Sequence, residues 1–311
     1  MIYFIVNLKS KTGVSADTWN TVKGVMREEG ITYRAFQTRY PGHAMALAEK
    51  ISSLPGKEIQ LVVVGGDGTV NEVLSGITDF SKVSLGIVPS GSGNDFAGGL
   101  GISKDPEVAI RRIISDRERS VIDLGSVTYD GATRPRYFGI SSGVGLDAIV
   151  CKKALHSKQK AFLNRFGLGK LTYLLLTVET LFSMRTVRGR VSFDGEKSKR
   201  FDKLIFAAAM NLPSEGGGVP MAPDANPQDG HLTLCLAHDV SRFAAFFALP
   251  WLVLGKHDRL KCFYLRDFGS CLIRLEKPVT LHGDGEVLGE VKEILFEIHK
   301  GKLQLLHEIR A

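Results

Sequence analysis

The sequence has few cysteines and lacks the spacings that would make them metal ligands or a redox pair. Its four cysteines share no C-x-x-C pattern, and its eight histidines form no H-x-x-H or H-E-x-x-H pattern, so we expect no zinc site. No secretory leader is visible at the amino end, which favours free thiols and a cytoplasmic protein.

Long apolar runs are also missing. The longest, FAAFFALPWLVLG at residues 243–255, is interrupted by Pro250 and is shorter than the ~20 residues that a membrane-spanning helix needs. We therefore expect no transmembrane anchor. With 311 residues, of which 44% are hydrophobic and 23% charged, the chain has the composition of a globular protein, and its length predicts about two domains.

Acidic residues are absent from one stretch, although the net charge of the whole chain is only +7. Between Ala148 and Val178 there is no Asp or Glu, whereas basic residues are frequent: Lys152, Lys153, Lys158, Lys160, Arg165 and Lys170. Such a stretch fits a transient contact with an anionic membrane surface or nucleic acid, and a solvated helix face is the alternative. Because zinc ligands and RNP-type aromatic residues are missing from it, we expect no nucleic-acid partner.

The first third of the chain alternates strand and helix patterns. Strands are predicted at IYFIV (2–6), ITYRAFQT (31–38), IQLVVVGG (59–66) and VSLGIVP (83–89), with helical spacing between and after them, as in HAMALAEKISSL (43–54) and EVAIRRII (107–114). The alternation predicts an α/β fold. Its N-terminal domain, residues 1–123, would be a doubly wound parallel sheet that binds ligands beyond the carboxyl ends of its strands.

From about residue 124 the pattern changes. Asp-Gly hairpin signals occur in TYDGATRPRYFGI (128–140) and VSFDGEKSKRF (191–201), and KLIFAAAMN (203–211), GHLTLCLA (230–237) and CLIRLEKPVTLHG (271–283) are strand-like. Helical stretches near 150–185 and 241–256 interrupt them. We expect a mainly antiparallel β-sandwich domain over residues 124–291, and leave open whether the C-terminal segment, about residues 292–311, returns to the first domain.

A glycine-rich turn, VVVGGDGTVNEV at 62–73, contains an acid where phosphate chemistry would not favour one. Gly65 and Gly66 follow a buried strand, and Thr69 with Glu72 has the spacing of a capping box, so we expect a helix to begin at Thr69. Backbone N–H groups at such a helix start attract an anion. Asp67 would repel that anion unless Mg²⁺ stood between them; the alternative is that Asp67 caps the helix.

A second loop of the same kind follows the next strand. GIVPSGSGNDFAGGL (86–100) runs from an apolar strand into Gly91 and Gly93, then Asn94 and Asp95 at a helix start. A third strand end offers Asn7, Ser10 and Thr12. Neither loop is a Walker P-loop, since no GxxxxGK[ST] occurs, and the third glycine of the dinucleotide fingerprint is missing.

GGDGTxNEV at 65–73, followed by NDFA at 94–97 after the second loop, resembles the diacylglycerol kinase catalytic-domain family of lipid kinases. Its bacterial members are two-domain enzymes related to sphingosine and ceramide kinases, and the likeness covers essentially the whole chain. GGDGT alone is shared with NAD kinases, whereas NDFA separates the lipid kinases from them. The chain departs from the family at the first strand end, where N-P-x-S-G is replaced by Asn7-Leu8-Lys9-Ser10-Lys11.

The resemblance implies transfer of the γ-phosphoryl group of Mg-ATP to a hydroxyl of a membrane lipid. Nucleotide-binding positions follow from the family motifs, namely Asn7, Ser10, Thr38, Gly65, Gly66, Asp67, Gly68, Thr69, Asn71, Glu72, Ser92, Asn94 and Asp95. The family places an acid at Asp123, so Asp67, Asp95 and Asp123 would form a Mg²⁺ or water-linked cluster. A turn residue between the domains is the alternative for Asp123.

The resemblance also implies a base and a second metal site. The family's D-G-E motif is here LHGDGEVLG (281–289), whose Glu286 would take the proton of the lipid hydroxyl; sphingosine kinases suggest Asp67 for that role instead. MAPDANPQDGHL (221–232) resembles a structural Mg²⁺ site formed by the Asp229 side chain with backbone oxygens of Asn226 and His231. For both stretches the alternative is an Asp-Gly turn with no catalytic or metal-binding role.

Three rival interpretations stand beside the lipid kinase. GISSGVGLDAIV (139–150) contains a weak GxGxxA match, which we reject because it lies among hairpins rather than in an amino-terminal βαβ unit. An NAD kinase-like phosphotransferase is the serious enzymatic rival. An inactive membrane- or nucleic-acid-binding relative is disfavoured by the intact Asp67, Asp95 and Glu286. Which lipid is phosphorylated and whether the chain forms a homodimer are open.

Overall fold

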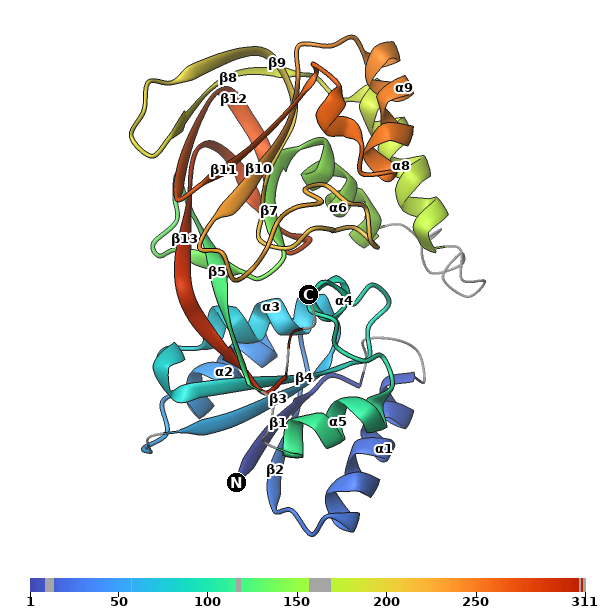
Figure 1. Cartoon of the computed structure of the whole chain (residues 1–311), viewed down its shortest axis with the longest axis vertical. Helices are drawn as coiled ribbons and strands as arrows, with labels where there is room; N and C mark the ends of the chain where they lie inside the picture. Colours follow the sequence, from blue (N-terminus) through green and yellow to red (C-terminus); the bar gives the residue numbers. More distant parts are fainter. Residues whose placement is uncertain (9–13, 57, 116–118, 157–168, 308, 310–311) are drawn as a thin grey trace. The chain divides into compact units, whose positions relative to one another are not determined.

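The computed structural model describes the chain except for residues 9–13, 57, 116–118, 157–168, 308 and 310–311 (Figure 1). It divides into two compact units. The first unit comprises residues 1–124 and 300–311, and the second unit comprises residues 125–299. The expected boundary lay at 123/124, and the chain comes back to the first unit at Lys300 rather than near residue 292.

Parallel strands form the sheet of the first unit. They pair in the order β2-β1-β3-β4, and the end of β13 pairs parallel with β4. Their bounds are β1 (Ile2–Val6), β2 (Tyr33–Gln37), β3 (Ile59–Gly65), β4 (Val83–Pro89) and β13 (Glu286–Leu305). The β-branched runs of β3 and β4 are buried along nearly their whole length. Such continuous apolar runs are expected of strands that are covered on both faces of the sheet.

Helices cover this sheet. They are α1 (Val14–Glu28), α2 (His43–Ser52), α3 (Asp67–Gly76), α4 (Asp95–Gly99) and α5 (Pro106–Ser115), with a 3₁₀ turn η1 (Phe80–Lys82). In Figure 1, α1 packs with α5 and α2 packs with α3. Trp19, Val22 and Met26 recur at helical spacing on α1 and are all buried, with the ring of Trp19 5.3 Å from that of Phe4 on β1. Strand and helix positions in this unit therefore follow the sequence periodicity closely.

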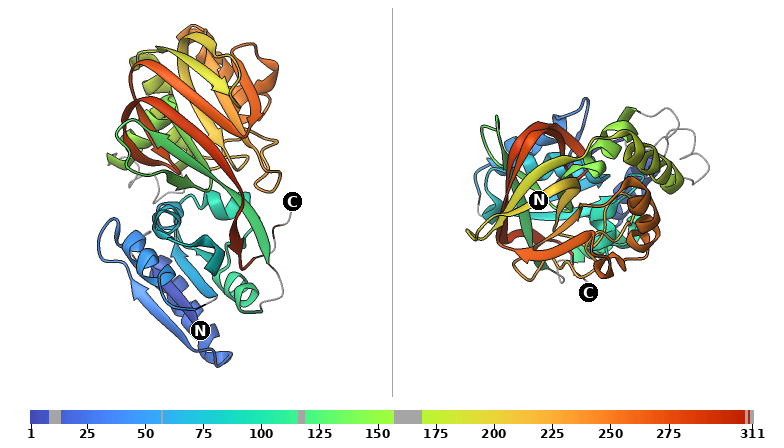
Figure 2. Two further views of the ribbon diagram at one scale, coloured as in Figure 1. Left: turned by 90° about the vertical axis from the view of Figure 1, so that its left-hand side faces the viewer. Right: turned by 90° about the horizontal axis from the view of Figure 1, so that it is seen from above.

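Strands of the second unit pair antiparallel. They are β5 (Ser120–Tyr129), β6 (Arg136–Phe138), β7 (Ser141–Gly145), β8 (Val187–Phe193), β9 (Lys199–Met210), β10 (Leu232–His238), β11 (Phe263–Phe268) and β12 (Ser270–Gly283), with most of β13. The long strands β9 and β12 each pair with β8 through their first part and with β7 through their last part. Figure 2 shows β12 and β13, orange to red, running beside one another across this unit.

Tight turns in the second unit fall where the Asp-Gly signals predicted them. Asp194 (φ 49°) and Gly195 (φ 78°) connect β8 to β9, and Gly131 (φ 89°) lies between β5 and β6. Both hairpin predictions are confirmed, because only glycine and short polar residues adopt this left-handed backbone readily. The helices of this unit are α6 (Leu146–His156), α8 (Gly169–Ser183) and α9 (Arg242–Val253), with a 3₁₀ turn η2 (His257–Arg259).

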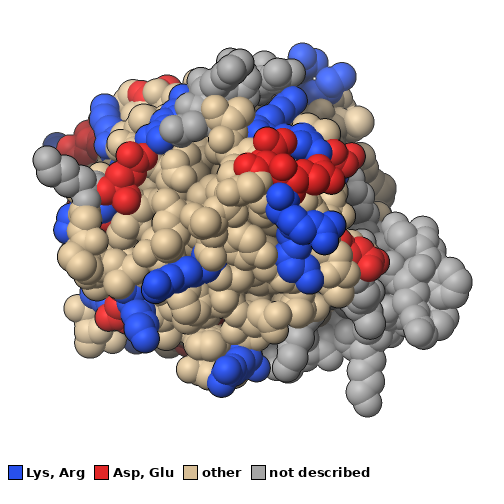
Figure 3. Space-filling model, turned by 90° about the horizontal axis from the view of Figure 1, so that it is seen from below, with Lys and Arg blue, Asp and Glu red and all other residues tan. Residues whose placement is uncertain are grey.

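Charged side chains of both signs lie close together on the face in Figure 3. Close pairs of opposite charge also occur in the first unit, where the Arg111 guanidinium pairs with Glu28, Glu29 and Glu107 at 2.7–3.0 Å. The described residues thus form no surface of one sign on that face. All four cysteines are free thiols, and among the described residues no helix is long and apolar enough to cross a bilayer.

Candidate active site

The glycine turn after β3 leads into α3 earlier than the sequence predicted. The helix begins at Asp67, and its N-cap is Gly66, which makes no side-chain capping bond. The predicted capping box of Thr69 and Glu72 is therefore wrong. The Glu72 carboxylate instead accepts from the N–H groups of Gly42 (2.9 Å) and Ala44 (3.0 Å), so it holds the start of α2 against α3.

Both glycine loops of the first unit are packed backbone to backbone. A Cβ atom on Gly91 would lie 2.5 Å from the Cα of Gly66, and one on Gly66 would lie 2.9 Å from the Cα of Gly91. Ser90 N–H donates to the Gly65 carbonyl at 2.9 Å. Only glycine permits this approach, so the two motifs recognised in the sequence are joined into one structure at the carboxyl ends of β3 and β4.

Asn94 closes the second loop. It adopts a left-handed backbone (φ 57°), and its side chain accepts from Gly91 N–H (2.9 Å) and donates to the Gly91 carbonyl (3.0 Å). Asparagine is among the few residues that tolerate this backbone. The loop is thereby held in one shape, with Ser92 and Gly93 exposed at its tip.

Asp67 does not cap its own helix. Its Oδ1 accepts from the N–H of Phe96 at 3.0 Å, at the start of the short helix α4 that carries the second motif. The Cβ position of Gly93 lies 3.1 Å from Asp67 Oδ2 and 3.7 Å from Asp95 Oδ2, so the two carboxylates face the same glycine. Two neighbouring carboxylates are a donor set that suits a hard cation.

Asp123 is the third carboxylate that the sequence placed in this cluster. It is buried in β5, and its Oδ1 accepts from Gly301 N–H at 2.6 Å, which holds the returning end of the chain. In the part of the chain that the structure describes, one group of three acids, histidines or cysteines brings its ligand atoms within 4.8 Å of one another, and it does not include Asp123. A cluster of Asp67, Asp95 and Asp123 linked by Mg²⁺ or water stays a prediction.

The remaining expected nucleotide positions gather at the same edge of the sheet. Asn7 follows β1, and its amide donates to the Thr69 hydroxyl at 3.0 Å. Thr38 follows β2 and is half-buried, while Asn71 is buried on α3. Ser10 lies outside the described residues. The carboxyl ends of neighbouring parallel strands are the usual ligand site of such sheets. The role of these residues in nucleotide binding stays a prediction.

The stretch expected to hold a structural metal forms a turn. Asp229 Oδ1 accepts from His231 N–H at 2.9 Å, and the Asn226 carbonyl accepts from Asp229 N–H at 3.4 Å. Gly230 between them has φ 78°. These oxygens thus have partners within the turn itself, and their role as Mg²⁺ ligands stays a prediction.

The D-G-E stretch connects β12 to β13. Asp284 (φ 48°) and Gly285 (φ 83°) form the turn, and Glu286 is the half-buried first residue of β13. The buried Asp284 carboxylate accepts from three consecutive N–H groups, those of residues 139, 140 and 141, at 2.8–3.0 Å. Asp284 thereby fixes the hairpin to the start of β7, and the position of Glu286 follows from it.

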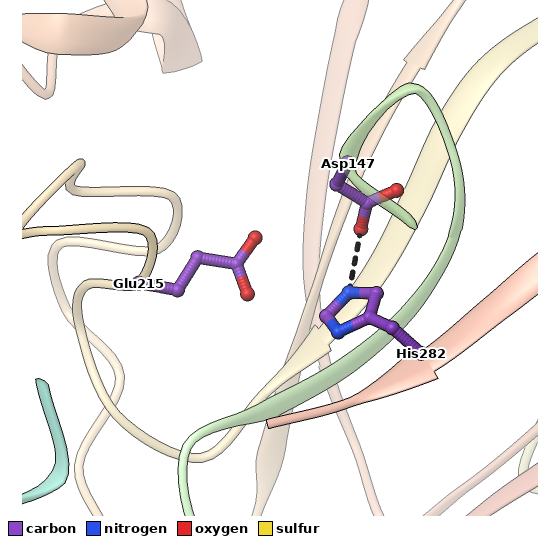
Figure 4. Close-up of side chains that lie close together, drawn as sticks. All are labelled: Asp147, Glu215 and His282. Carbon is purple, nitrogen blue, oxygen red and sulfur yellow. Dashed lines mark hydrogen bonds and ion pairs between the residues drawn. The ribbon is translucent and has the colours of Figure 1, made fainter. Parts of the chain in front are cut away.

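A cluster of one histidine and two carboxylates in the second unit was not predicted from the sequence. His282 on β12, Asp147 at the start of α6 and Glu215 after β9 bring their side-chain ligand atoms within 4.8 Å (Figure 4). His282 Nε2 lies 3.0 Å from Asp147 Oδ2, and both side chains are buried, at 1% and 9% exposure. The Ser141 hydroxyl donates to Glu215. A Cβ on Gly143 would collide with the Asp147 carboxylate, so glycine makes room for it.

The carboxylates of this group favour a protonated His282. Burial alone would lower the pKa of His282, but the charges of Asp147, Glu215 and Asp284 outweigh burial and raise the pKa to about 9. The Gly285 N–H donates to Nδ1 at 3.3 Å, which favours a neutral ring because Nδ1 then carries no proton. This hydrogen bond is long, and the charges of the three carboxylates outweigh its effect on the pKa. An imidazolium and a ring bound to a metal through Nε2 would both carry a proton on Nδ1, opposite that N–H, so this contact does not distinguish them; the three carboxylates favour a positive charge at this place, on the ring or on a cation.

Comparison with known proteins agrees with this two-part organisation. Residues 1–127 match the model of the diacylglycerol kinase catalytic domain, and residues 141–307 match that of the YegS C-terminal NAD kinase beta sandwich-like domain. The mixed α/β fold with a β-sandwich-like second part is thus confirmed. The doubly wound order of the helices stays a prediction.

Individual relatives cover most of the chain. A Bacillus subtilis (strain 168) protein named "Putative lipid kinase YtlR" is 28% identical over 290 residues, 92% of this chain and 93% of that one. A diacylglycerol kinase of the same organism is 28% identical over 237 residues, 75% of this chain and 73% of that one.

A solved structure shares the fold. The crystal structure of a "putative diacylglycerol kinase" from Bacillus anthracis str. Sterne has a TM-score of 0.77 at 22% identity, covering 99% of this chain and 96% of that one. The two family models and the relatives confirm the resemblance first carried by GGDGT and NDFA. The chain belongs to the diacylglycerol kinase catalytic-domain family and is a kinase.

Proposed function

We propose that the protein transfers the γ-phosphoryl group of Mg-ATP to a hydroxyl group of a membrane lipid. The observation that carries the proposal is the joining of the two glycine loops by Asp67, which accepts from Phe96 N–H at 3.0 Å. The loops present the amino end of α3 and a closed second loop at one sheet edge, where backbone N–H groups attract phosphate.

Asp67 and Asp95 would hold the Mg²⁺ ion. Their Oδ2 atoms lie 3.1 and 3.7 Å from the Cβ position of Gly93, and a hard cation there would be bound by one or two carboxylates, water and phosphate oxygens. Bound Mg²⁺ neutralises charge on the transferred phosphoryl group. It would also remove the repulsion between Asp67 and the nucleotide.

Glu286 is the base that we propose for the acceptor hydroxyl. It begins β13 beside a hairpin that Asp284 fixes through three backbone N–H groups, so the carboxylate stands on a rigid support. The competing base, Asp67, already uses Oδ1 to accept from Phe96. A carboxylate engaged in this way is better suited to positioning and metal binding than to proton transfer.

The test measures transfer of radiolabelled phosphate from ATP to extracted lipids, to NAD and to water. We expect label in the lipid fraction. Glu286→Gln should leave ATP affinity unchanged and lower kcat by the ~10²–10⁴-fold typical of a lost general base, whereas Asp67→Asn should weaken Mg-ATP binding. Glu290→Gln, an exposed glutamate on the same strand, is the matched control.

Other outcomes contradict parts of the proposal. Label in NAD alone would favour an NAD kinase-like phosphotransferase. Near-normal kcat in Glu286→Gln together with nearly complete loss in Asp67→Asn would assign the base to Asp67. Label in no acceptor would support an inactive binding protein.

We further propose that the protein works in the cytoplasm and reaches its lipid at an anionic membrane surface. The acid-free stretch gives less support to this idea than the sequence suggested. Lys153 pairs with Glu179 at 2.8 Å and Lys152 with Glu290 at 3.3 Å. Lys158, Lys160 and Arg165 lie outside the described residues, as does the side chain of Lys170. A membrane contact therefore has to be sought elsewhere on the described surface.

A further inference from the structure

Large apolar side chains are exposed mainly on α8 and α9. Of the fourteen such residues exposed in the described part of the chain, nine lie on these helices or at the end of α9. The most exposed are Phe243 (71%), Phe247 (70%) and Leu254 (67%). Apolar surface gathered in this way marks an interaction site rather than chance exposure.

These residues lie along one side of α9. Phe243, Phe247 and Trp251 are four residues apart and Leu254 follows three later, which places them in a row on the helix, while Ala248 and Leu252 are buried on the other side. In a water-exposed helix the outer row is normally polar. On α9 both sides are apolar, so the exposed row is suited to contact a partner that is itself apolar.

Helix α8 continues the same surface. α8 and α9 lie side by side (Figure 1), with the ring of Phe182 5.7 Å from Phe243 and 6.0 Å from Phe246. The Arg242 guanidinium donates to the carbonyls of Phe182 (2.7 Å) and Met184 (2.6 Å), which locks the end of α8 to the start of α9. We call the exposed apolar residues of α8 and α9, with Leu254, the α8–α9 face.

Basic residues stand at both ends of α9, at the border of the α8–α9 face. From Ser241 to Lys256 the chain contains no acid, and Arg242 and Lys256 stand at the two ends of α9. The partners of the Arg242 guanidinium are neutral carbonyl groups. Lys261 and one acid, Asp239, line an open groove of about 610 Å³ together with Phe247 and Trp251. Cations beside apolar side chains fit a surface with anionic headgroups over hydrocarbon.

We propose that the α8–α9 face inserts into the surface of an anionic lipid bilayer. The proposal rests on the proposed function, because a kinase that acts on a membrane lipid has to meet that lipid at the bilayer surface. The twelve residues of α9 measure about 18 Å, too short to cross the hydrocarbon core, so the helix lies along the interface. A second copy of the chain is a poorer occupant, because a two-fold contact would bring the same cationic border against itself.

The test measures binding of the full chain to vesicles without ATP. Vesicles of phosphatidylglycerol mixed with phosphatidylcholine are compared with phosphatidylcholine alone. The variant F247S/W251S removes two exposed aromatic side chains, and we expect its binding to fall by roughly 10²-fold, about tenfold for each side chain. V108S/V121S removes two exposed apolar side chains from the first unit and is the matched control, expected to bind as the wild type does.

A conservative variant and an activity readout complete the design. F247L/W251F keeps the apolar character and should bind within a few-fold of the wild type. Phosphorylation of detergent-dispersed lipid should be unchanged in F247S/W251S, so a failure of kinase activity in the wild type would contradict the proposed function and leave the vesicle result standing. Equal vesicle binding of F247S/W251S and the wild type would overturn the membrane proposal. So would a dimeric wild type and a monomeric variant in light scattering, which would assign the face to a second copy.

Discussion

His282 should make the stability of the second unit depend on pH. The pKa of its ring is raised from 6.5 to about 9, since the carboxylates of Asp147, Glu215 and Asp284 outweigh the effect of burial. The folded state therefore holds a proton that the unfolded chain releases. Stability from this group is present in full below about pH 6.5 and is lost as pH rises through about 9.

The size of the effect follows from the shift. Raising a pKa from 6.5 to about 9 at ~1.4 kcal/mol per pH unit gives about 3 kcal/mol of stability. With urea m-values of ~1–3 kcal/mol/M, the unfolding midpoint should move down by about 1–3 M between pH 6.5 and 9. Asp147→Asn removes the carboxylate 3.0 Å from Nε2, so much of this slope should disappear.

Two tryptophans allow the second unit to be observed alone. Trp19 lies in the first unit and Trp251 in the second, so Trp19→Phe leaves one reporter of second-unit unfolding. Urea titrations at several pH values would compare this parent with Asp147→Asn and with Glu179→Gln, an exposed pair member expected to keep the parental slope. Burial also raises the pKa of the Cys235 and Cys271 thiols in all three proteins. The Asp147 charge adds to the rise at Cys235, so Asp147→Asn lowers that smaller contribution as well. Equal slopes in parent and Asp147→Asn would refute the imidazolium and favour a neutral ring held by Gly285.

Two further predictions concern residues that fix the backbone of a loop or hairpin. Gly91→Ala should weaken ATP binding by at least about tenfold, because its Cβ would lie 2.5 Å from the Gly66 Cα and force the loops apart; calorimetric titration measures this, and unchanged affinity would show that the loops need not touch. Asp284→Asn should lower second-unit stability by about 2 kcal/mol, since three N–H groups lose a charged acceptor, and urea unfolding that matches the parent would contradict the support that we assign to it.

Local patterns in the sequence predicted helices, strands and turns well where no tertiary contact competes with the local preference. The parallel strands follow from β-branched runs such as residues 59–65, and the hairpin at Asp194-Gly195 from its turn residues. The capping box failed because a tertiary contact competed with it. Glu72 has the right spacing from Thr69, yet α2 lies close enough for its N–H groups to take the carboxylate. A local rule cannot contain that information.

The histidine–carboxylate group could not be predicted because no local spacing signals it. His282 and Asp147 are 135 positions apart in sequence. They meet through strand register, since β12 pairs with β7 at His282↔Gly143, and Asp147 follows β7 at the start of α6. The side of α9 that faces solvent was equally hidden, because a helix that is apolar on every side gives no indication of which side packs inward.

Asp67 shows why the two family motifs occur together. An acid in a phosphate loop seemed unfavourable on electrostatic grounds, and neither a cap on its own helix nor a metal ligand alone explains its geometry. One oxygen accepts from Phe96 N–H and so ties the first motif to the helix of the second; the other faces Gly93 together with Asp95. Without a helix of the NDFA type, Oδ1 would lose that donor and the carboxylate could rotate away from the cation position. The second motif therefore orients the aspartate of the first, which makes GGDGT and NDFA one functional structure rather than two.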